Sequence, residues 1–371
     1  MSKTLTASAT LIGTIIGAGI LGIPYVIMKS GFGFGLIHLI ALAIILALTT
    51  LYLGEIALRT KTNHHLTGYA KLYLGEKGKK IMFAAVAFGI ISALIAYLIG
   101  EGESFSQLFF NTAQYSIHFA IAFWIVLSIL IYFGIKALEE GETIGIILIF
   151  IMVVSIAIFS ANKISIANLT YNNLENMFLP FGVILFAYLG LTAIPELERI
   201  LGKNRKPMRK SIILAYVTSF ILYTIFAIAV LGLKGYATPQ IATLSLGKPF
   251  IFLGILTIFT SYLALSIAFL DTLHFDFNIS KLKSWLYTIF TPLIIYIILQ
   301  LLDIAQFTKV LGIGGVISGG LMATLILLMI KKAKKLGTRK PEYSMPYSKI
   351  LTWILIAIFI IGAILEIKAL V

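Results

Sequence analysis

The sequence predicts an all-α membrane protein, and three observations carry that prediction. Hydrophobic residues make up 60% of the 371 residues, charged residues only 12%, and the mean hydropathy is +1.02. A water-soluble protein of this length cannot hide so much apolar surface. The chain divides into apolar stretches of roughly 18–25 residues, long enough to cross a hydrocarbon core of about 30 Å. Because the alternating pattern of a membrane β-barrel is missing, these stretches are expected to be helices.

Eleven such stretches follow one another, with no segment between them long enough for a soluble domain. The first stretch lacks the cleavage site of a signal peptide, so we expect it to remain as a span. The chain contains no cysteine, which excludes disulfides. The expected spans are residues 5–28, 34–58, 81–108, 118–136, 142–161, 177–199, 211–233, 248–273, 284–302, 309–330 and 350–367.

The basic residues predict the orientation of these spans. With a cytoplasmic amino terminus, most of the 29 lysines and arginines fall on the inner side, chiefly in the loops after spans two, six and ten. This bias follows the positive-inside rule and places the carboxyl terminus outside. It also explains the net charge of +14 without nucleic acid, because the charges face an anionic leaflet. We therefore expect a multi-pass protein of the cell (plasma) membrane. The basic residues on the outer side are Lys29, Lys163, Lys234, Lys248, Lys309 and Lys368.

Two spans share a motif that interrupts a helix. Span one contains GILGIP at Gly19–Pro24, and span six contains GLTAIP at Gly190–Pro195. The two copies are five spans apart, an odd number, so the second copy enters the membrane from the opposite side. This arrangement predicts an inverted 5+5 repeat, residues 1–165 and 166–335, followed by an eleventh span within 336–371. We expect the whole chain to form one structural domain.

Glycine and proline in these motifs predict that helices one and six are broken. Glycine permits unusual dihedral angles, and proline removes a hydrogen-bond donor. Unwinding frees amides that hold a carboxylate and carbonyls that hold a cation. Paired, broken helices in two halves point to the central site of a secondary transporter. The pattern Gly13-x-x-x-Gly17 is also typical of simple helix packing, and the matched pair of motifs favours the site.

Three segments together resemble one family. Residues 14–24 (TIIGAGILGIP) resemble the first span of the amino acid/auxin permease family, closest to its hydroxy and aromatic amino acid permeases. Residues 181–196 resemble its sixth span and residues 260–271 its eighth, although Ala264 stands where glycine is usual. Residues 96–108 are a weaker likeness of its third span. The resemblance implies a LeuT-type fold of the amino acid–polyamine–organocation superfamily, with the substrate held between spans one, three, six and eight.

The resemblance also implies where a neutral, aromatic or hydroxy amino acid binds. Its carboxylate is expected on backbone amides around Ala18, and its ammonium on carbonyls around Ala187. Two aromatic side chains beside the second break are expected to close over the substrate side chain, with core or lipid packing as the alternative. The expected substrate-site residues are Thr14, Ile16, Gly17, Ala18, Gly19, Tyr97, Phe186, Ala187, Tyr188 and Gly190.

Hydroxyl groups in span eight are similar to one side of the sodium site of this fold. Thr260 and Ser261 are adjacent, and Thr257 lies one turn earlier. With the carbonyls of Gly13 and Ile16 they would form the oxygen shell that a hard cation prefers. The alternative is that each hydroxyl bonds back to its own helix. Sodium would then be the coupling ion, and we expect no other cofactor.

Proton coupling stays open, because the most similar branch is generally proton-coupled. Acids embedded in a membrane are candidate proton relays, and Glu101, Glu103 and Asp271 are such acids. Glu198, beyond the proline of span six, is interpreted as part of a solvated helix end or an inner gate. No nucleophile–base constellation or metal-ligand spacing is present, so we expect no enzyme. The expected function is cation-coupled import by alternating access, with the monomer as the working unit; a passive uniporter or channel and a membrane sensor of amino acids are the alternatives.

Overall fold

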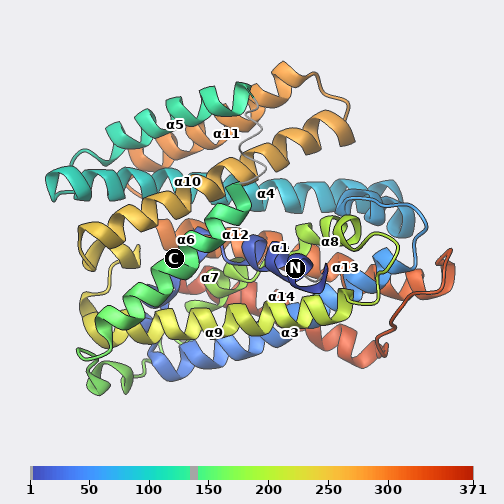
Figure 1. Cartoon of the computed structure of the whole chain (residues 1–371), viewed down its shortest axis with the longest axis horizontal. Helices are drawn as coiled ribbons and strands as arrows, with labels where there is room; N and C mark the ends of the chain where they lie inside the picture. Colours follow the sequence, from blue (N-terminus) through green and yellow to red (C-terminus); the bar gives the residue numbers. More distant parts are fainter. Residues whose placement is uncertain (1–2, 134–140, 371) are drawn as a thin grey trace.

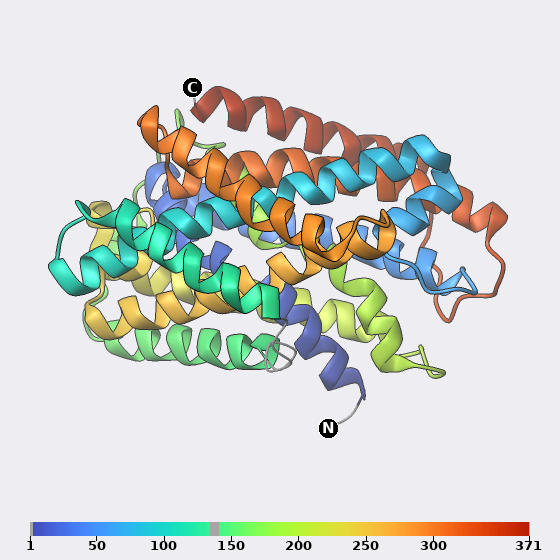
Figure 2. The same cartoon turned by 90° about the horizontal axis from the view of Figure 1, so that it is seen from above.

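The computed structural model describes residues 3–133 and 141–370, and every regular element in these ranges is helical. No strand occurs in them, and one isolated bridge pairs Gly31 with Asn172. Many of the long helices run roughly along the longest axis of the molecule in Figure 1. Viewed from above, α14 (red) and α1 (dark blue) lie on opposite flanks of the bundle (Figure 2). The all-α prediction is confirmed for these residues.

The helices of the first half are α1 (Lys3–Ile15), η1 (Ala18–Gly22), α2 (Ile23–Ser30), α3 (Phe32–Leu58), α4 (Leu66–Phe110), α5 (Ser116–Phe133) and α6 (Gly141–Ser160). Next come η3 (Ile166–Leu169), α7 (Pro180–Ala187), η4 (Leu191–Ala193), α8 (Ile194–Leu201), α9 (Met208–Lys234), η5 (Gly235–Ala237) and η6 (Ala242–Ser245). The last are α10 (Lys248–Asp271), η7 (Thr272–Asp276), α11 (Lys281–Leu301), α12 (Phe307–Gly314), η8 (Gly315–Gly319), α13 (Gly320–Leu336) and α14 (Lys349–Leu370).

Nine helices in the described ranges are long and apolar enough to cross a membrane, or ten if the bent pair α1 and η1–α2 forms one span. The fifth expected span, 142–161, coincides with α6, whose described side chains begin at Ile146 and form a shorter apolar helix. Residues 134–136, expected to end span four, lie outside the described ranges. The chain is thus a multi-pass membrane protein, and the count of eleven spans stays a prediction.

The helix that carries span three is longer than the expected span. We expected span three to begin at residue 81, but α4 begins at Leu66 and is 45 residues long. Gly75 divides it with a φ of 80°, a conformation that glycine adopts without strain. The lysine-rich stretch around this bend is polar because it lies beyond the apolar part of the helix, and polarity alone does not prevent helix formation.

Both expected breaks are present, and they share one architecture. In helix one, a 3-10 turn (η1) separates α1 from α2, and the two parts are bent by 49°. In helix six, η4 separates α7 from α8. Pro24 and Pro195 each lie in the first turn of the second half-helix, where a missing amide costs nothing. The repeated motif therefore has the same structural result in both copies.

The loops rich in lysine and arginine gather at one end of the bundle, which we call the basic end: residues 59–65, 202–207 and 337–348. The Arg59 carbonyl accepts the Thr338 amide (2.8 Å), and Arg205 donates to Asn63 (3.0 Å). Lys3 donates to the Leu201 carbonyl at 3.4 Å, so α1 also begins at this end. These contacts place loops that are distant in sequence on one side of the molecule.

Candidate functional site

Helix one is interrupted at Gly17, which has an extended backbone (φ −93°, ψ −162°). Its amide donates to the Ile15 carbonyl at 3.1 Å, and its carbonyl accepts the Ile20 amide at 3.3 Å. The amides of Ala18 and Gly19 have no backbone acceptor within the described ranges. Of the three amides expected to hold a carboxylate, that of Gly17 is therefore bonded to the backbone, and those of Ala18 and Gly19 are not.

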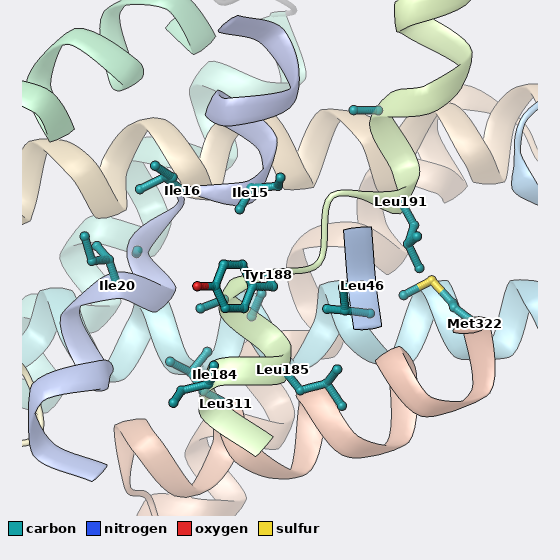
Figure 3. Packing of buried hydrophobic residues seen from close by; sticks show 14 of the residues in the cluster. Ile15, Ile16, Ile20, Leu46, Ile184, Leu185, Tyr188, Leu191, Leu311 and Met322 are labelled. Atoms are coloured by element: carbon teal, nitrogen blue, oxygen red, sulfur yellow. The ribbon is translucent and has the colours of Figure 1, made fainter. Parts of the chain in front are cut away.

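The break in helix six lies directly against the break in helix one. A Cβ on Gly19 would lie 3.3 Å from the Ala187 Cα, and a Cβ on Gly190 would lie 2.5 Å from the Ile15 side chain. In Figure 3 the Tyr188 ring lies beside the segment that carries Ile15 and Ile16, with its hydroxyl directed toward that segment. Two glycines thus permit the broken segments to touch.

Two tyrosines of α9 hold the breaks together. The Tyr223 hydroxyl lies 2.7 Å from the Ala187 carbonyl oxygen and 2.9 Å from that of Ile15, so it reaches both broken helices. The Tyr216 hydroxyl lies 3.2 Å from the Tyr188 carbonyl oxygen and 2.7 Å from the Thr50 hydroxyl. We did not predict either tyrosine. They could have been predicted because two phenol groups lie seven residues apart in an apolar span, and polar groups in membrane helices face the bundle interior.

Groups from α4 and α10 complete the surroundings of Gly17. A Cβ on Gly17 would lie 3.5 Å from both the Tyr97 hydroxyl and the Ser261 hydroxyl. The Tyr97 hydroxyl also interacts with the backbone of Ala18 and with Ser261. The expected substrate residue of span three and a hydroxyl of span eight therefore meet at the first break.

The carbonyls expected to face a substrate ammonium are partly occupied. Those of Ala187 and Tyr188 accept the α9 hydroxyls, although each carbonyl oxygen has a second lone pair. The Tyr188 hydroxyl itself is buried and has no hydrogen-bond partner in the described residues. An unpaired buried hydroxyl costs roughly 1–3 kcal/mol, which a polar ligand or water at the break would recover.

Two other expected residues serve packing in this arrangement. Phe186 lies between Gly19 and Gly315, where added Cβ atoms would approach its side chain to 3.3 and 2.9 Å. The Thr14 hydroxyl donates to the Thr10 carbonyl (3.1 Å) within its own helix.

Some of the expected sodium ligands are already hydrogen-bonded within the protein, and others are not. The Thr257 hydroxyl donates to the Leu253 carbonyl (2.9 Å), and the Thr260 hydroxyl lies 3.1 Å from the Leu256 carbonyl oxygen, so back-bonding occurs at both. The Gly13 and Ile16 carbonyls accept no hydrogen bond in the described residues, as expected beyond the last turn of a helix. No group of three or more His, Cys, Asp or Glu with metal-binding geometry occurs in those residues.

The three relay candidates differ in their surroundings. Glu101 is 0% exposed, and neither carboxyl oxygen has a hydrogen-bond partner in the described part of the chain. It lies one helical turn beyond Tyr97 on α4, so the two share a helix face. Glu103 is half-buried. Asp271 is exposed at the end of α10, about 15 Å along the helix from Ser261. Burial beside the break therefore singles out Glu101.

Ion pairs of two buried glutamates connect the helices and loops of the basic end. Glu198 at the end of α8 is buried, accepts the Tyr69 hydroxyl (2.6 Å) and pairs with Arg205 (2.7 Å). The interpretation of Glu198 as part of a solvated helix end was wrong, because α4 covers it. Glu55 on α3 is buried and pairs with Arg59 (2.8 Å) and Lys334 (2.7 Å).

Tyr343, in the loop between α13 and α14, also ties this end together. Its hydroxyl donates to the Leu51 carbonyl at 2.7 Å. Burial, with the Glu55 carboxylate nearby, raises the pKa of the Tyr343 hydroxyl, so the hydroxyl keeps its proton. The loop is thereby bonded to the end of α3.

Comparison with known sequences finds one permease family and several amino acid transport proteins. The sequence pattern of the tryptophan/tyrosine permease family matches residues 1–243, which include both breaks and α9. The chain is 23% identical over 240 residues to tyrosine-specific transport system 1 of Haemophilus influenzae, covering 63% of this chain and 58% of that protein. It is 26% identical over 359 residues to glutamine transporter 2 of Aliivibrio fischeri, covering 91% of each. The tryptophan-specific transport protein of Shigella flexneri is 22% identical over 244 residues, covering 62% of this chain and 58% of that protein.

Proposed function

The chain belongs to the tryptophan/tyrosine permease family, and from this premise we propose that it is a cation-coupled secondary transporter that imports a neutral amino acid. The observation that carries the proposal is the contact between two broken helices, where the Ala18 and Gly19 amides have no backbone acceptor in the described residues and the Tyr188 hydroxyl is unpaired. Free main-chain groups of both polarities suit a zwitterion.

The surroundings favour an uncharged substrate side chain. No lysine or arginine is among the fully buried residues of the described ranges. Aromatic side chains surround the breaks instead, chiefly Tyr97, Phe186, Tyr188 and Tyr223. The relatives named for tyrosine, tryptophan and glutamine all carry neutral amino acids. We propose an aromatic or hydroxy amino acid as the first substrate to test.

The contact between the breaks supports alternating access as the proposed mechanism. Because even a Cβ on Gly19 would lie only 3.3 Å from the Ala187 Cα, a substrate must separate the broken segments to enter. We propose that the chain has the inverted 5+5 arrangement, with residues 1–165 and 166–335 as repeats and α14 as the addition. The basic end would face the cytoplasm, with the carboxyl terminus outside, and the monomer would be the working unit.

Two coupling ions have separate support. The free carbonyls of Gly13 and Ile16 favour a sodium ion near the hydroxyl of Ser261. The buried, unpaired carboxyl of Glu101 favours a proton. Uptake by purified protein in liposomes, driven by a sodium gradient or by a pH gradient alone, distinguishes them. Uptake driven by a pH gradient in the absence of sodium would contradict the proposal of a sodium site.

The experiment that tests the function combines binding with transport. A thermal-shift panel of the twenty amino acids identifies ligands, since a bound ligand stabilises the folded protein. Uptake of each ligand into liposomes should then require a cation gradient and saturate. Gly19→Val should abolish uptake because its side chain forces the two breaks apart. Binding without uptake would identify a sensor, and uptake without gradient dependence would identify a passive uniporter.

A further inference from the structure

Glu366 of α14 is a buried carboxyl group far from the two breaks in sequence. The residue is 0% exposed; Oε2 accepts the Gly182 amide at 3.2 Å, and Oε1 has no partner in the described residues. Gly182 lies in the first turn of α7, where amides have no acceptor within the helix. The carboxyl group therefore caps the first half of the broken helix six.

A glycine one turn earlier fixes α14 against the same turn. Gly362 packs on the Phe181 ring so closely that a Cβ would overlap it. The Glu366 Oε1 and the Gly312 carbonyl oxygen lie 2.7 and 2.6 Å from the position of a Cβ on Gly182. Two acceptor oxygens thus face one point. A proton on Oε1 would convert one of them into a donor.

A cavity lies beside this carboxyl group. Its volume is about 160 Å³, enough for several water molecules at about 30 Å³ each. Glu366, Lys309, Tyr25 and Leu179 are among the residues that line it. Lys309 forms no ion pair within the described ranges. The cavity lies at the end of the bundle opposite the basic end, since α7 and α12 begin there.

The other titratable groups nearby are few. His38 of α3 lies edge-on to the Phe181 ring, with 6.3 Å between ring centroids. Lys368, on α14 itself, is exposed, and the π-helix η8 carries no titratable side chain. The lysines of α13, at residues 331–335, lie at its far end, toward the basic end. Lys309, Tyr25 and His38 are therefore the groups to separate from Glu366 in an experiment.

We propose that Glu366 is a proton-binding site that links α14 to the first half of helix six, α7. A proton that enters through the cavity binds Oε1, and the neutral carboxyl then donates a hydrogen bond to the Gly312 carbonyl; on deprotonation the proton leaves Oε1 for water. A neutral acceptor binds an amide less strongly than a carboxylate does. Protonation therefore loosens the start of α7 and opens the cavity. This site is separate from the proposed substrate site and needs no bound amino acid.

The test uses the absence of cysteine in the chain. Leu179→Cys places a single thiol in the cavity, and Leu174→Cys, at a residue 72% exposed, is the reference. The full-length protein in liposomes, without amino acid, is labelled with an impermeant maleimide between about pH 5 and 9, the range of perturbed carboxyl groups. The ratio of the two labelling rates removes the intrinsic pH dependence of the thiol.

The ratio should rise several-fold toward acid pH, and Glu366→Gln should make it high and independent of pH. Glu366→Asp, which keeps a titrating carboxyl, should retain a pH response with a shifted midpoint and serves if the Gln variant does not fold. Glu175→Gln, at an exposed carboxyl group, and His38→Gln should leave the response unchanged. An unchanged response in Glu366→Gln, or its loss in His38→Gln, would overturn the proposal. Because no substrate is present, a failure of amino acid transport does not affect the result.

Discussion

Replacing Tyr223 by Phe tests whether the two broken helices are held together by a side chain of α9. The change removes one oxygen and keeps the ring, which lies 5.0 Å from the Tyr188 ring. The lost hydroxyl is the group that reaches the carbonyls of both Ala187 and Ile15. We expect the variant to fold and its two breaks to open more readily.

The size of the effect follows from what remains at each carbonyl. The hydroxyl has one proton and donates to one carbonyl at a time. The Ile15 carbonyl keeps a second donor, the Gly17 amide at 3.1 Å. The carbonyl left without a donor is therefore that of Ala187. A buried carbonyl without a donor costs roughly 1–3 kcal/mol. We take about 1.4 kcal/mol, which corresponds to a tenfold shift toward the separated arrangement.

Hydrogen exchange measured by mass spectrometry reports this opening directly. In Tyr223→Phe, the amides of residues 15–20 and 184–190 should exchange about tenfold faster. Tyr262→Phe is the matched control: its hydroxyl is buried but has no partner in the described residues, so its removal breaks no hydrogen bond. Equal exchange in Tyr223→Phe and the unmodified protein would refute the bridge. A uniform increase along the chain would also refute it, because the effect would then be global instability.

Three further tests, two of them with a matched control, distinguish local contacts from general packing. Gly19→Ala should impair uptake strongly because its Cβ presses on the α7 backbone at 3.3 Å, whereas Gly17→Ala, with contacts of 3.5 Å, should retain uptake; both are measured in liposomes. Glu101→Gln should abolish uptake driven by a pH gradient while leaving substrate exchange, and normal gradient-driven uptake would remove Glu101 from the proton path. Glu55→Gln should lower the free energy of unfolding by about 3 kcal/mol because it leaves two cations unpaired. Glu76→Gln, in an exposed pair, should change it by less than about 1 kcal/mol, and equal losses in thermal unfolding would contradict this account.

The fold was largely predictable because its main determinants are local in sequence. Apolar length fixes a membrane span, and glycine and proline act on the backbone where they stand. Nine or ten long apolar helices and both breaks therefore lie where spans were expected in the described residues. The start of α4 was not predicted, because the polar residues before Gly75 form a helix that the membrane criterion does not detect.

The contacts around the breaks were less predictable because they are tertiary. The sequence indicated Gly17 and Tyr97 as site residues, but not that the Tyr97 and Ser261 hydroxyls both approach Gly17. Tyr223 is an ordinary residue of an apolar helix until the packing of α9 against α1 brings it to the carbonyls. Glu198 was interpreted as solvated because the sequence does not show that α4 covers it. Their substrate and ion roles stay predictions.

The first half of helix six explains how such a site can move. α7 contains only eight residues, too few to be stable as an isolated helix, so its position depends on contacts at its two ends. Glu366 caps its first turn, and Tyr223 binds the carbonyl of its last residue. Each contact is one hydrogen bond, worth roughly 1 kcal/mol net. Differential ligand affinity of a few kcal/mol shifts such an equilibrium substantially. An unbroken helix of the same span would instead have to disrupt its own backbone hydrogen bonds to move one half, which is why we propose that the interruption itself allows the second arrangement that transport requires.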